Sequence, residues 1–543
     1  MGPEQQREIS RRSLGRLAVG AVGAAVVTGA GAVIPVAPAS AGGPASLYPK
    51  GVRARRLYAI AESNLSSAER VLIATLQGRV ARRPAGTKPE GIYVDAGNGY
   101  PVWLADLAAR YGVAVTQVDS AWTLVDKFSV GPAGVTKYVL YRDGDGSVNP
   151  ATTVAGISGA VAVEETIEPQ AVQHGLKRAA DVRGRTDAWV KRNYWSRLRH
   201  DLVFEQKPDF ANQLRDYATM AGSFMFYDGN SAFRREVVSA MDRDGATMGW
   251  GDASSGEDSF VSMSSEVGVG TRAADHGRNL APLSGITMDR LKQRASGDAP
   301  VAKPGTHHVA FVLTDGDNVQ WLLNDFQSSD RWFASPLRGQ FDMGWGMAPG
   351  LIDTAPSVMR WYYDNESTGA HRDRFVVGPS GGAYLYPSMY PAADLDLHTA
   401  RLDAHMARAD LGVVQILDFD AFDKTALWSR YLRRASIKGL IYLEYSRYDG
   451  LKGRIGWANG KPVISASASL WEGLSGADDA SVTAQLNAAP RDPRVAGGYS
   501  VVMVHAWSKT LANVKNVIDN LDPQVKVVTP DALVQLVRMN VKH

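Results

Sequence analysis

The chain of 543 residues is long enough for roughly two to four domains of ordinary size. Its 45% apolar and 21% charged residues exclude a disordered or fibrous protein, and the absence of cysteine excludes disulfides, thiolate metal sites and cysteine nucleophiles. The formal charge is +3 and falls to +1 without residues 1–41, which hold four Arg and two Glu, so no nucleic-acid partner is expected.

The N-terminus is typical of an export signal. Ser10-Arg11-Arg12-Ser13-Leu14 precedes an Ala/Gly/Val-rich stretch at 17–33, and Ala39-Ser40-Ala41 supplies the small residues of a cleavage site. We predict a twin-arginine signal peptide over residues 1–41 and a secreted, extracellular mature protein. A transmembrane anchor is the alternative, but the Gly-rich stretch is short and weakly hydrophobic for a span of ~20 residues. No other segment approaches that length, so no membrane association is expected after cleavage.

Residues 42–170 predict an N-terminal α/β domain, because apolar runs alternate with helical segments such as the one opened by Ser66 and Glu69, which are spaced as a capping box. Gly97-x-Gly99 follows a predicted strand but lacks the third glycine and the later acidic residue of a dinucleotide fingerprint, so no cofactor is expected. Residues 171–300 are rich in Arg, Trp and Tyr, and we interpret them as a helical and loop region that bridges two domains.

Residues 301–543 predict a C-terminal (β/α)8-like barrel, so the expected fold class is α/β throughout. Eight β-rich runs recur every 24 to 37 residues with room for a helix after each, and they begin near residues 307, 339, 374, 411, 437, 461, 498 and 525. A seven-stranded or distorted barrel, or an open doubly wound sheet, is the alternative.

Acidic residues follow several of these runs, at the strand ends where a parallel barrel carries its catalytic groups. They are Asp315, Asp317, Asp418, Asp420 and Glu444. Asp418 and Glu444 each follow a largely apolar run of five residues, and their burial without a partner or a task would be costly. Asp317 and Asp420 have helix capping as an alternative role.

Aromatic and polar residues accompany these carboxylates. The predicted substrate-binding residues are Asn318, Trp250, Trp345, Tyr384, Tyr386, Tyr445, His505 and Trp507. Aromatic faces beside carboxylates suit a sugar ring, although buried aromatics also anchor loops. Hydrolysis of a glycosidic bond needs one protonated and one ionised carboxyl group. We therefore predict a glycosidase with Glu444 as the acid and Asp418 as the nucleophile or base, and the other three carboxylates as further candidates.

The loop Gly381-Gly-Ala-Tyr-Leu-Tyr-Pro387 resembles the signature of the GxGYxYP family, secreted bacterial proteins classed as predicted glycoside hydrolases with a distinct N-terminal domain. Thr314-Asp-Gly-Asp-Asn318 and Met343-Gly-Trp-Gly346 are also similar to that family. Ala383 stands where the signature has its second glycine, which indicates that the backbone there needs no positive φ. The resemblance covers nearly the whole mature chain and implies carbohydrate hydrolysis without fixing a substrate or a catalytic pair.

Three other functions stay open. Gly378-Pro-Ser380-Gly-Gly382 fits a G-x-S-x-G motif followed by Asp418 and His505 in the chain order of α/β-hydrolases, but Pro387 and Pro391 leave little room for the required helix. A metal-dependent polysaccharide deacetylase would use Asp315, Asp317 and a histidine, although no dense His cluster supports a metal site. A non-catalytic carbohydrate-binding protein would keep only the aromatic residues. We expect an oligo- or polysaccharide substrate, no cofactor, no metal and no obligate protein partner.

Overall fold

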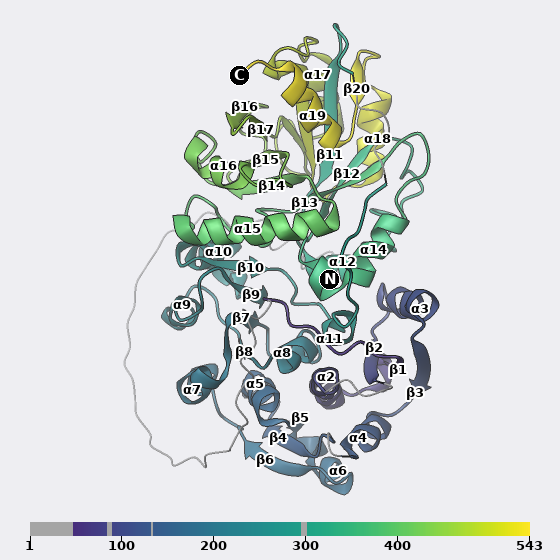
Figure 1. Cartoon of the computed structure of the whole chain (residues 1–543), viewed down its shortest axis with the longest axis vertical. Coiled ribbons are helices and arrows are strands. Elements are labelled where there is room, and N and C mark those ends of the chain that lie inside the picture. The colour runs from purple at the N-terminus through teal and green to yellow at the C-terminus, as the bar shows by residue number, and fades with distance from the viewer. Residues whose placement is uncertain (1–46, 84–88, 132–133, 295–300) are drawn as a thin grey trace.

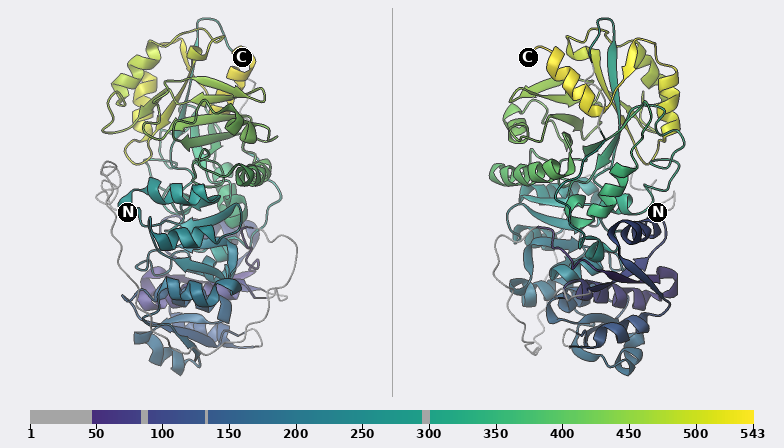
Figure 2. Two further views of the ribbon diagram at one scale, coloured as in Figure 1. Left: turned by 90° about the vertical axis from the view of Figure 1, so that its left-hand side faces the viewer. Right: turned by 45° about the vertical axis from the view of Figure 1, so that its right-hand side comes forward.

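The computed structural model describes residues 47–83, 89–131, 134–294 and 301–543. The predicted signal peptide lies outside these described residues. Figure 1 shows an elongated molecule with the C-terminal sheet at one end and the sheet of residues 137–181 at the other, and Figure 2 shows the same order from two further sides. Within the described ranges, no helix combines the length and apolarity needed to cross a bilayer.

The first unit is a three-stranded parallel sheet in the order β2-β1-β3, formed by β1 (Arg56–Ala61), β2 (Glu90–Asp95) and β3 (Ala114–Val118). Its helices are α2 (Ser67–Ala81), α3 (Tyr100–Tyr111) and α4 (Ala121–Ser129). The predicted capping box is confirmed, because Glu69 N donates to Ser66 Oγ at 3.3 Å and Ser66 N donates to Glu69 Oε2 at 2.9 Å. The α/β character of this part follows the sequence prediction.

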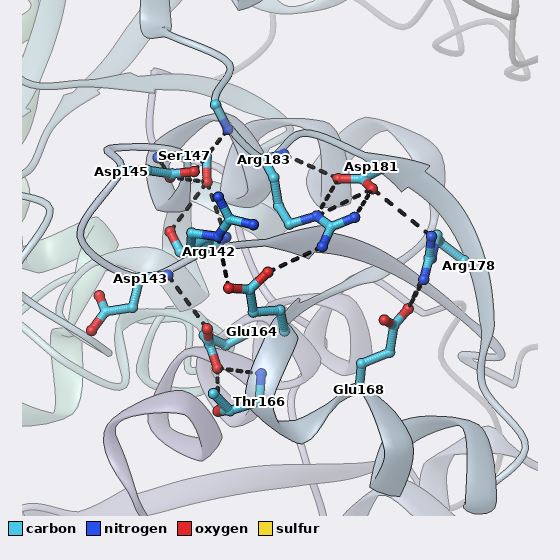
Figure 3. A network of polar contacts seen from close by, with 12 residues as sticks. Arg142, Asp143, Asp145, Ser147, Glu164, Thr166, Glu168, Arg178, Asp181 and Arg183 are labelled. Atoms are coloured by element: carbon cyan, nitrogen blue, oxygen red, sulfur yellow. Dashed lines mark hydrogen bonds and ion pairs between the residues drawn. The ribbon is translucent and has the colours of Figure 1, made fainter.

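The second unit is another parallel sheet in the order β5-β4-β6, formed by β4 (Lys137–Tyr141), β5 (Val161–Glu164) and β6 (Lys177–Asp181) with α5 (Val148–Ser158), α6 (Glu168–Gln173) and α7 (Asp187–Tyr194). A polar network covers its carboxyl edge (Figure 3), where Arg183 Nη2 donates to Asp181 Oδ2 at 2.6 Å and Gly184 N donates to Asp145 Oδ2 at 2.8 Å. Open α/β sheets commonly bind ligands at this edge, but here the charged groups contact one another.

The third unit corrects the prediction of a helical and loop bridge over residues 171–300. It holds a parallel sheet in the order β10-β9-β7-β8, with β7 (Arg199–Glu205), β8 (Ser223–Phe226), β9 (Gly245–Gly249) and β10 (Val269–Arg272). Its helices are α8 (Arg215–Ala221), α9 (Ala232–Ser239), α10 (Glu257–Glu266) and α11 (Leu280–Leu283). These strands are short and covered on both faces, so they lack the alternation that reveals a strand in a sequence. The predicted boundary at residue 170 is also wrong, since β6 ends at Asp181.

The C-terminal unit contains a strand at each of the eight predicted runs. Its ten-stranded sheet consists of β11 (His307–Leu313), β12 (Met343–Met347), β13 (Asp373–Val377), β14 (Val413–Asp418), β15 (Gly439–Glu444), β16 (Ile455–Ala458), β17 (Lys461–Ser465), β18 (Ala468–Leu470), β19 (Tyr499–Val504) and β20 (Val525–Val527). The longer helices around it are α14 (Pro356–Asp364), α15 (Ala392–Ala409), α16 (Thr425–Leu432), α17 (Asp479–Asn487), α18 (Leu511–Asp519) and α19 (Pro530–Asn540), and the short α12 (Val319–Leu323) follows β11.

This sheet is curled. Ala466 N donates to Tyr442 O at 3.0 Å and Ser467 N donates to Val501 O at 2.8 Å, so the segment between β17 and β18 contacts both β15 and β19. The sheet departs from a regular eight-stranded barrel, because β16 is antiparallel and β20 pairs with β11 over three residues without a ladder to β12 in the described chain. The protein is therefore an α/β protein of parallel sheets with one curled, barrel-like sheet.

The curled sheet packs directly on the first and third units. One apolar cluster contains Trp103 of α3, Phe204 of β7 and Trp345 of β12, so a single core runs through three units. In Figure 1, α15 lies between the curled sheet and the elements α10 and β10. The shared core fixes the relative position of the third unit and the loops at the carboxyl ends of the curled sheet.

Candidate active site

The signature loop pairs with the third unit. Tyr384 N donates to Thr271 O at 2.7 Å and Thr271 N donates to Tyr384 O at 3.1 Å, which makes an antiparallel bridge to β10. A Cβ atom on Gly270 would lie 2.5 Å from Cβ of Ala383, so the loop fits only because position 270 has no side chain. Ala383 does not take a positive φ, as the sequence predicted.

The loop after β11 carries Asp315 and Asp317, and three glycines allow its close packing. A Cβ on Gly316 would lie 2.0 Å from the carbonyl carbon of Gly346, and a Cβ on Gly378 would lie 2.6 Å from Asp317 N. Asp315 has a φ of 63°, a left-handed conformation that is often found at functional sites. The alternative capping role of Asp317 is wrong, because Asn318 is the N-cap residue of α12 and makes no side-chain cap.

A third carboxyl group joins these two from another unit. Glu257 is the first residue of α10, and its Oε1 accepts a hydrogen bond of 3.1 Å from the Tyr384 hydroxyl. Burial raises the pKa of Glu257 to about 7, and the charge of Asp315 adds to this effect. Burial likewise raises the pKa of Asp317 to about 8, again with a contribution from Asp315. The arrangement raises the pKa of two carboxyl groups to neutral pH or above beside the charge of Asp315.

The sequence alone does not indicate Glu257, because it lies at the start of α10 in the third unit and not at a strand end of the C-terminal unit. The nearest signal was Trp250, which the sequence predicted as a binding residue and which stands seven positions earlier. Its ring stacks on Tyr384 with centroids 6.0 Å apart and an interplanar angle of 8°. The predicted binding residues Trp250 and Tyr384 therefore lie beside a carboxyl group that was not predicted.

Further aromatic rings surround the three carboxyl groups. The Tyr386 and Tyr445 ring centroids are 5.5 Å apart, and the Tyr448 and Trp471 centroids are 5.1 Å apart. Trp471 also stacks on His505 at 3.7 Å and 5°. Burial and the charges of Asp315 and Glu257 raise the pKa of Tyr448, so this ring lies close to the carboxyl groups. Tyr386, Tyr445 and His505 thus gather at the predicted end of the sheet.

The prediction of Asp418 and Glu444 as the catalytic pair does not fit the structure. Asp418 is 0% exposed, and burial raises its pKa to about 6. Its carboxylate accepts hydrogen bonds from Ser388 Oγ at 2.6 Å, Ser388 N at 2.7 Å and Phe419 N at 2.8 Å. Glu444 is 8% exposed and accepts hydrogen bonds from Asp420 N at 3.1 Å and the Tyr442 hydroxyl at 3.1 Å. Both carboxylates hold neighbouring loops in place.

The direction of these side chains explains the error. Residues alternate between the two faces of a strand, so Glu444 shares a face with Tyr442. The ring centroids of Tyr442 and of Trp428 in α16 are 5.6 Å apart. That face points toward the surrounding helices. Asp420 is exposed, and it does not cap α16, because the N-cap residue of that helix is Lys424.

Three predicted binding residues support the fold. Trp345 is 0% exposed, and its Nε1 donates to Asp373 Oδ1 at 2.8 Å. Trp507 packs against Trp321, with ring centroids 5.0 Å apart. Asn318 Nδ2 donates to Asp315 O at 3.2 Å and so steadies the acidic loop. The prediction for Trp345 is corrected to core packing, whereas Trp507 is partly exposed and its binding role stays a prediction.

The alternative serine triad is not assembled. Ser380 is 0% exposed, and its Oγ donates to Leu417 O at 3.2 Å, while His505 Nδ1 contacts Ser508 Oγ at 2.7 Å. Asp418 is bound by Ser388, and the next helix begins only at Ala392. Across the described residues, no group of three or more His, Cys, Asp or Glu side chains is arranged to hold a metal ion.

Comparisons with known proteins agree with the unit boundaries. Residues 305–538 match the "GxGYxYP putative glycoside hydrolase C-terminal domain", and residues 56–130, 135–198 and 200–285 match the first, second and third N-terminal domains of the same family. No functionally curated protein matches the chain.

A solved structure is also similar over most of the chain. It is described as a "putative hydrolase from Bacteroides thetaiotaomicron VPI-5482", and it is 33% identical with a TM-score of 0.84 over 90% of this chain and 96% of its own. Both descriptions name hydrolases. The chain belongs to the GxGYxYP family.

Proposed function

We propose that this protein is a glycoside hydrolase in which Glu257 is the general acid and Asp315 is the nucleophile or the base. The observation that carries the proposal is the Glu257 carboxyl group, which is held by Tyr384 and has its pKa raised to about 7 beside the charge of Asp315. Glycoside hydrolysis needs this asymmetry between a protonated and an ionised carboxyl group.

In the proposed reaction, Glu257 donates its proton to the glycosidic oxygen as the bond to the anomeric carbon breaks. Asp315 either takes a proton from the water that attacks this carbon, or attacks the carbon itself to form a glycosyl ester that water then hydrolyses as Glu257 takes the proton back. Thr314 Oγ1 donates a hydrogen bond to Asp315 Oδ2. Asp317, with its pKa of about 8, stays neutral, so only one negative charge builds up in the site. Burial raises the pKa of Tyr384, which keeps this hydroxyl a donor to Glu257.

The aromatic rings support a carbohydrate substrate. Trp250, Tyr445 and Trp471 are each partly exposed, and the apolar face of a sugar packs on such rings while its hydroxyls bind polar groups. The family description, a glycoside hydrolase, favours the same substrate class. We therefore propose an oligo- or polysaccharide as the substrate.

Two further parts of the proposal rest on the sequence. We interpret the curled sheet as a distorted (β/α)8-like barrel, because all eight predicted runs contain strands. We also propose that residues 1–41 direct export through the twin-arginine pathway, so that the mature protein acts outside the cell without a nucleic-acid or membrane partner.

The test is a screen of the purified mature protein against bacterial and plant oligo- and polysaccharides, followed by Glu257→Gln and Asp315→Asn on any substrate that is cleaved. We expect each substitution to lower kcat by about 10²- to 10⁴-fold. Asp420→Asn, which changes an exposed carboxylate outside the site, serves as the control and should leave kcat unchanged. Full activity of both site variants would refute the assignment, and sugar binding without turnover would favour a carbohydrate-binding protein.

A further inference from the structure

Arg272, the last residue of β10, is a buried cation that forms no ion pair with any described carboxylate. Its side chain is 6% exposed. Nη1 donates to Gly270 O at 3.3 Å, and the guanidinium lies 5.4 Å from the centre of the Tyr48 ring and interacts with the Tyr48 hydroxyl, while Nε has no hydrogen-bond partner. A buried charge without a counter-charge is costly, so this guanidinium is incompletely satisfied.

The neighbouring carboxylates are already bound by other cations. Asp353 contacts Lys50 at 3.1 Å, His405 at 3.1 Å and Arg408 at 2.9 Å. Asp244 contacts Arg401 at 3.0 Å. The region therefore has more cationic than anionic side chains, and Arg272 is the one left unpaired among those named here.

A small cavity lies against this guanidinium, between the third unit and the signature loop. Arg272, Tyr48, Thr271, Thr354 and Asp317 line it together with the backbone of residues 381–383. A Cβ on Gly382 would lie 4.0 Å from Arg272 Nη2, so the glycine leaves this side of the guanidinium uncovered. The lining is largely apolar, and Arg272 is its one cationic residue, beside Tyr48 and the Asp317 carboxyl group, whose pKa is raised to about 8.

We propose that this cavity binds a small monovalent anion of the halide class, chloride in solution, as the counter-ion of Arg272. The cavity has room for a water molecule or a small ion, which favours a halide over the larger phosphate and sulfate. The Tyr48 hydroxyl, which lies beside the Arg272 guanidinium, is a donor that suits an anion. The ion would lie beside Asp317 and favour its neutral form, so it would couple to the carboxyl cluster without depending on glycosidase activity.

The direct test is diffraction from crystals of the wild-type protein grown with bromide in place of chloride. We expect an anomalous bromide peak in the cavity within contact distance of the Arg272 guanidinium. A water molecule in the cavity, with bromide peaks only at the surface, would overturn the proposal.

A solution test uses thermal unfolding at constant ionic strength, with chloride exchanged for gluconate, which is too large for the cavity. We expect a saturable upward shift of Tm with chloride and with bromide. Arg272→Met should abolish this shift, and Arg235→Gln, which removes an exposed arginine paired with Glu266 in the same unit, should keep it. Equal Tm values in chloride and gluconate would contradict the proposal, and if Arg272→Met does not fold, the bromide experiment on the wild type decides.

Discussion

The hydroxyl of Tyr384 donates a hydrogen bond of 3.1 Å to Oε1 of Glu257, and this contact joins the signature loop to the first turn of α10. The backbone of the same loop forms a bridge with Thr271, and Tyr386 N donates a hydrogen bond of 3.0 Å to Ser265 Oγ. The signature residues therefore hold the third unit against the carboxyl end of the curled sheet. They bring Glu257 to a loop that carries Asp315 and Asp317.

Replacement of Glu257 by Gln should remove the general acid. We expect kcat to fall by about 10²- to 10⁴-fold for substrates with poor leaving groups and much less for aryl glycosides with acidic leaving groups, which need no proton. An acid with a pKa of about 7 is protonated below that pH, so wild-type activity should fall as the pH rises through about 7. The pH–activity profile of the variant should lack this decrease. An equal loss for both classes of substrate would contradict the role.

Replacement of Tyr384 by Phe tests whether this hydroxyl positions the acid. Its hydrogen bond lowers the pKa of Glu257, so the variant should move the alkaline limb of the pH–activity profile to higher pH. Tyr390→Phe is the matched control, since Tyr390 donates to Gly268 O at 2.6 Å in the same interface and contacts no carboxylate of the site. The role is refuted if both variants give the wild-type profile.

A side chain at Gly316 should displace the acidic loop. The added Cβ would lie 2.0 Å from backbone of Gly346, so Gly316→Ala should lower the free energy of unfolding by about 1–3 kcal/mol. At Gly369 the nearest atom would be 3.8 Å away, so Gly369→Ala should have a small effect. Chemical denaturation of both variants measures the difference, and equal stabilities would show that the loop can move without cost.

Asp216 should make stability depend on pH. It is fully buried, Ala281 N donates to its Oδ2 at 2.8 Å, its Oδ1 has no partner, and burial raises its pKa from 3.8 to about 7. The folded state thus holds a proton that the unfolded state releases near pH 4, so this contribution is complete below pH 4 and is lost as the pH rises through about 7.

The variant Asp216→Asn should lose this dependence. Between pH 5 and pH 7 the free energy of unfolding of the wild type should fall by about 2 kcal/mol more than that of the variant. Asp209→Asn changes an exposed carboxylate and should follow the wild type. Parallel curves for wild type and Asp216→Asn, measured by urea denaturation at each pH, would rule out the effect.

The positions of most strands along the C-terminal half of the chain follow from local patterns. Each of the eight predicted runs contains a strand, and the capping box at Ser66 and Glu69 forms as expected, because apolar runs and capping residues act over a few neighbouring residues. For the same reason, local patterns place Asp315 and Asp317 at a strand end and indicate the family from three short segments. The sheet at residues 199–272 escaped detection, since short strands covered on both faces have no period.

The identity of the paired carboxyl groups depends on how the units pack. Both faces of β14 and β15 are apolar, so the residues do not reveal that Asp418 and Glu444 turn toward the helices rather than toward the site. Glu257 comes within electrostatic reach of Asp315 only because a shared core and the signature loop bring two units together, and such proximity between distant segments leaves no local pattern. Burial, which sets the raised pKa of Glu257, is likewise a property of the packed molecule.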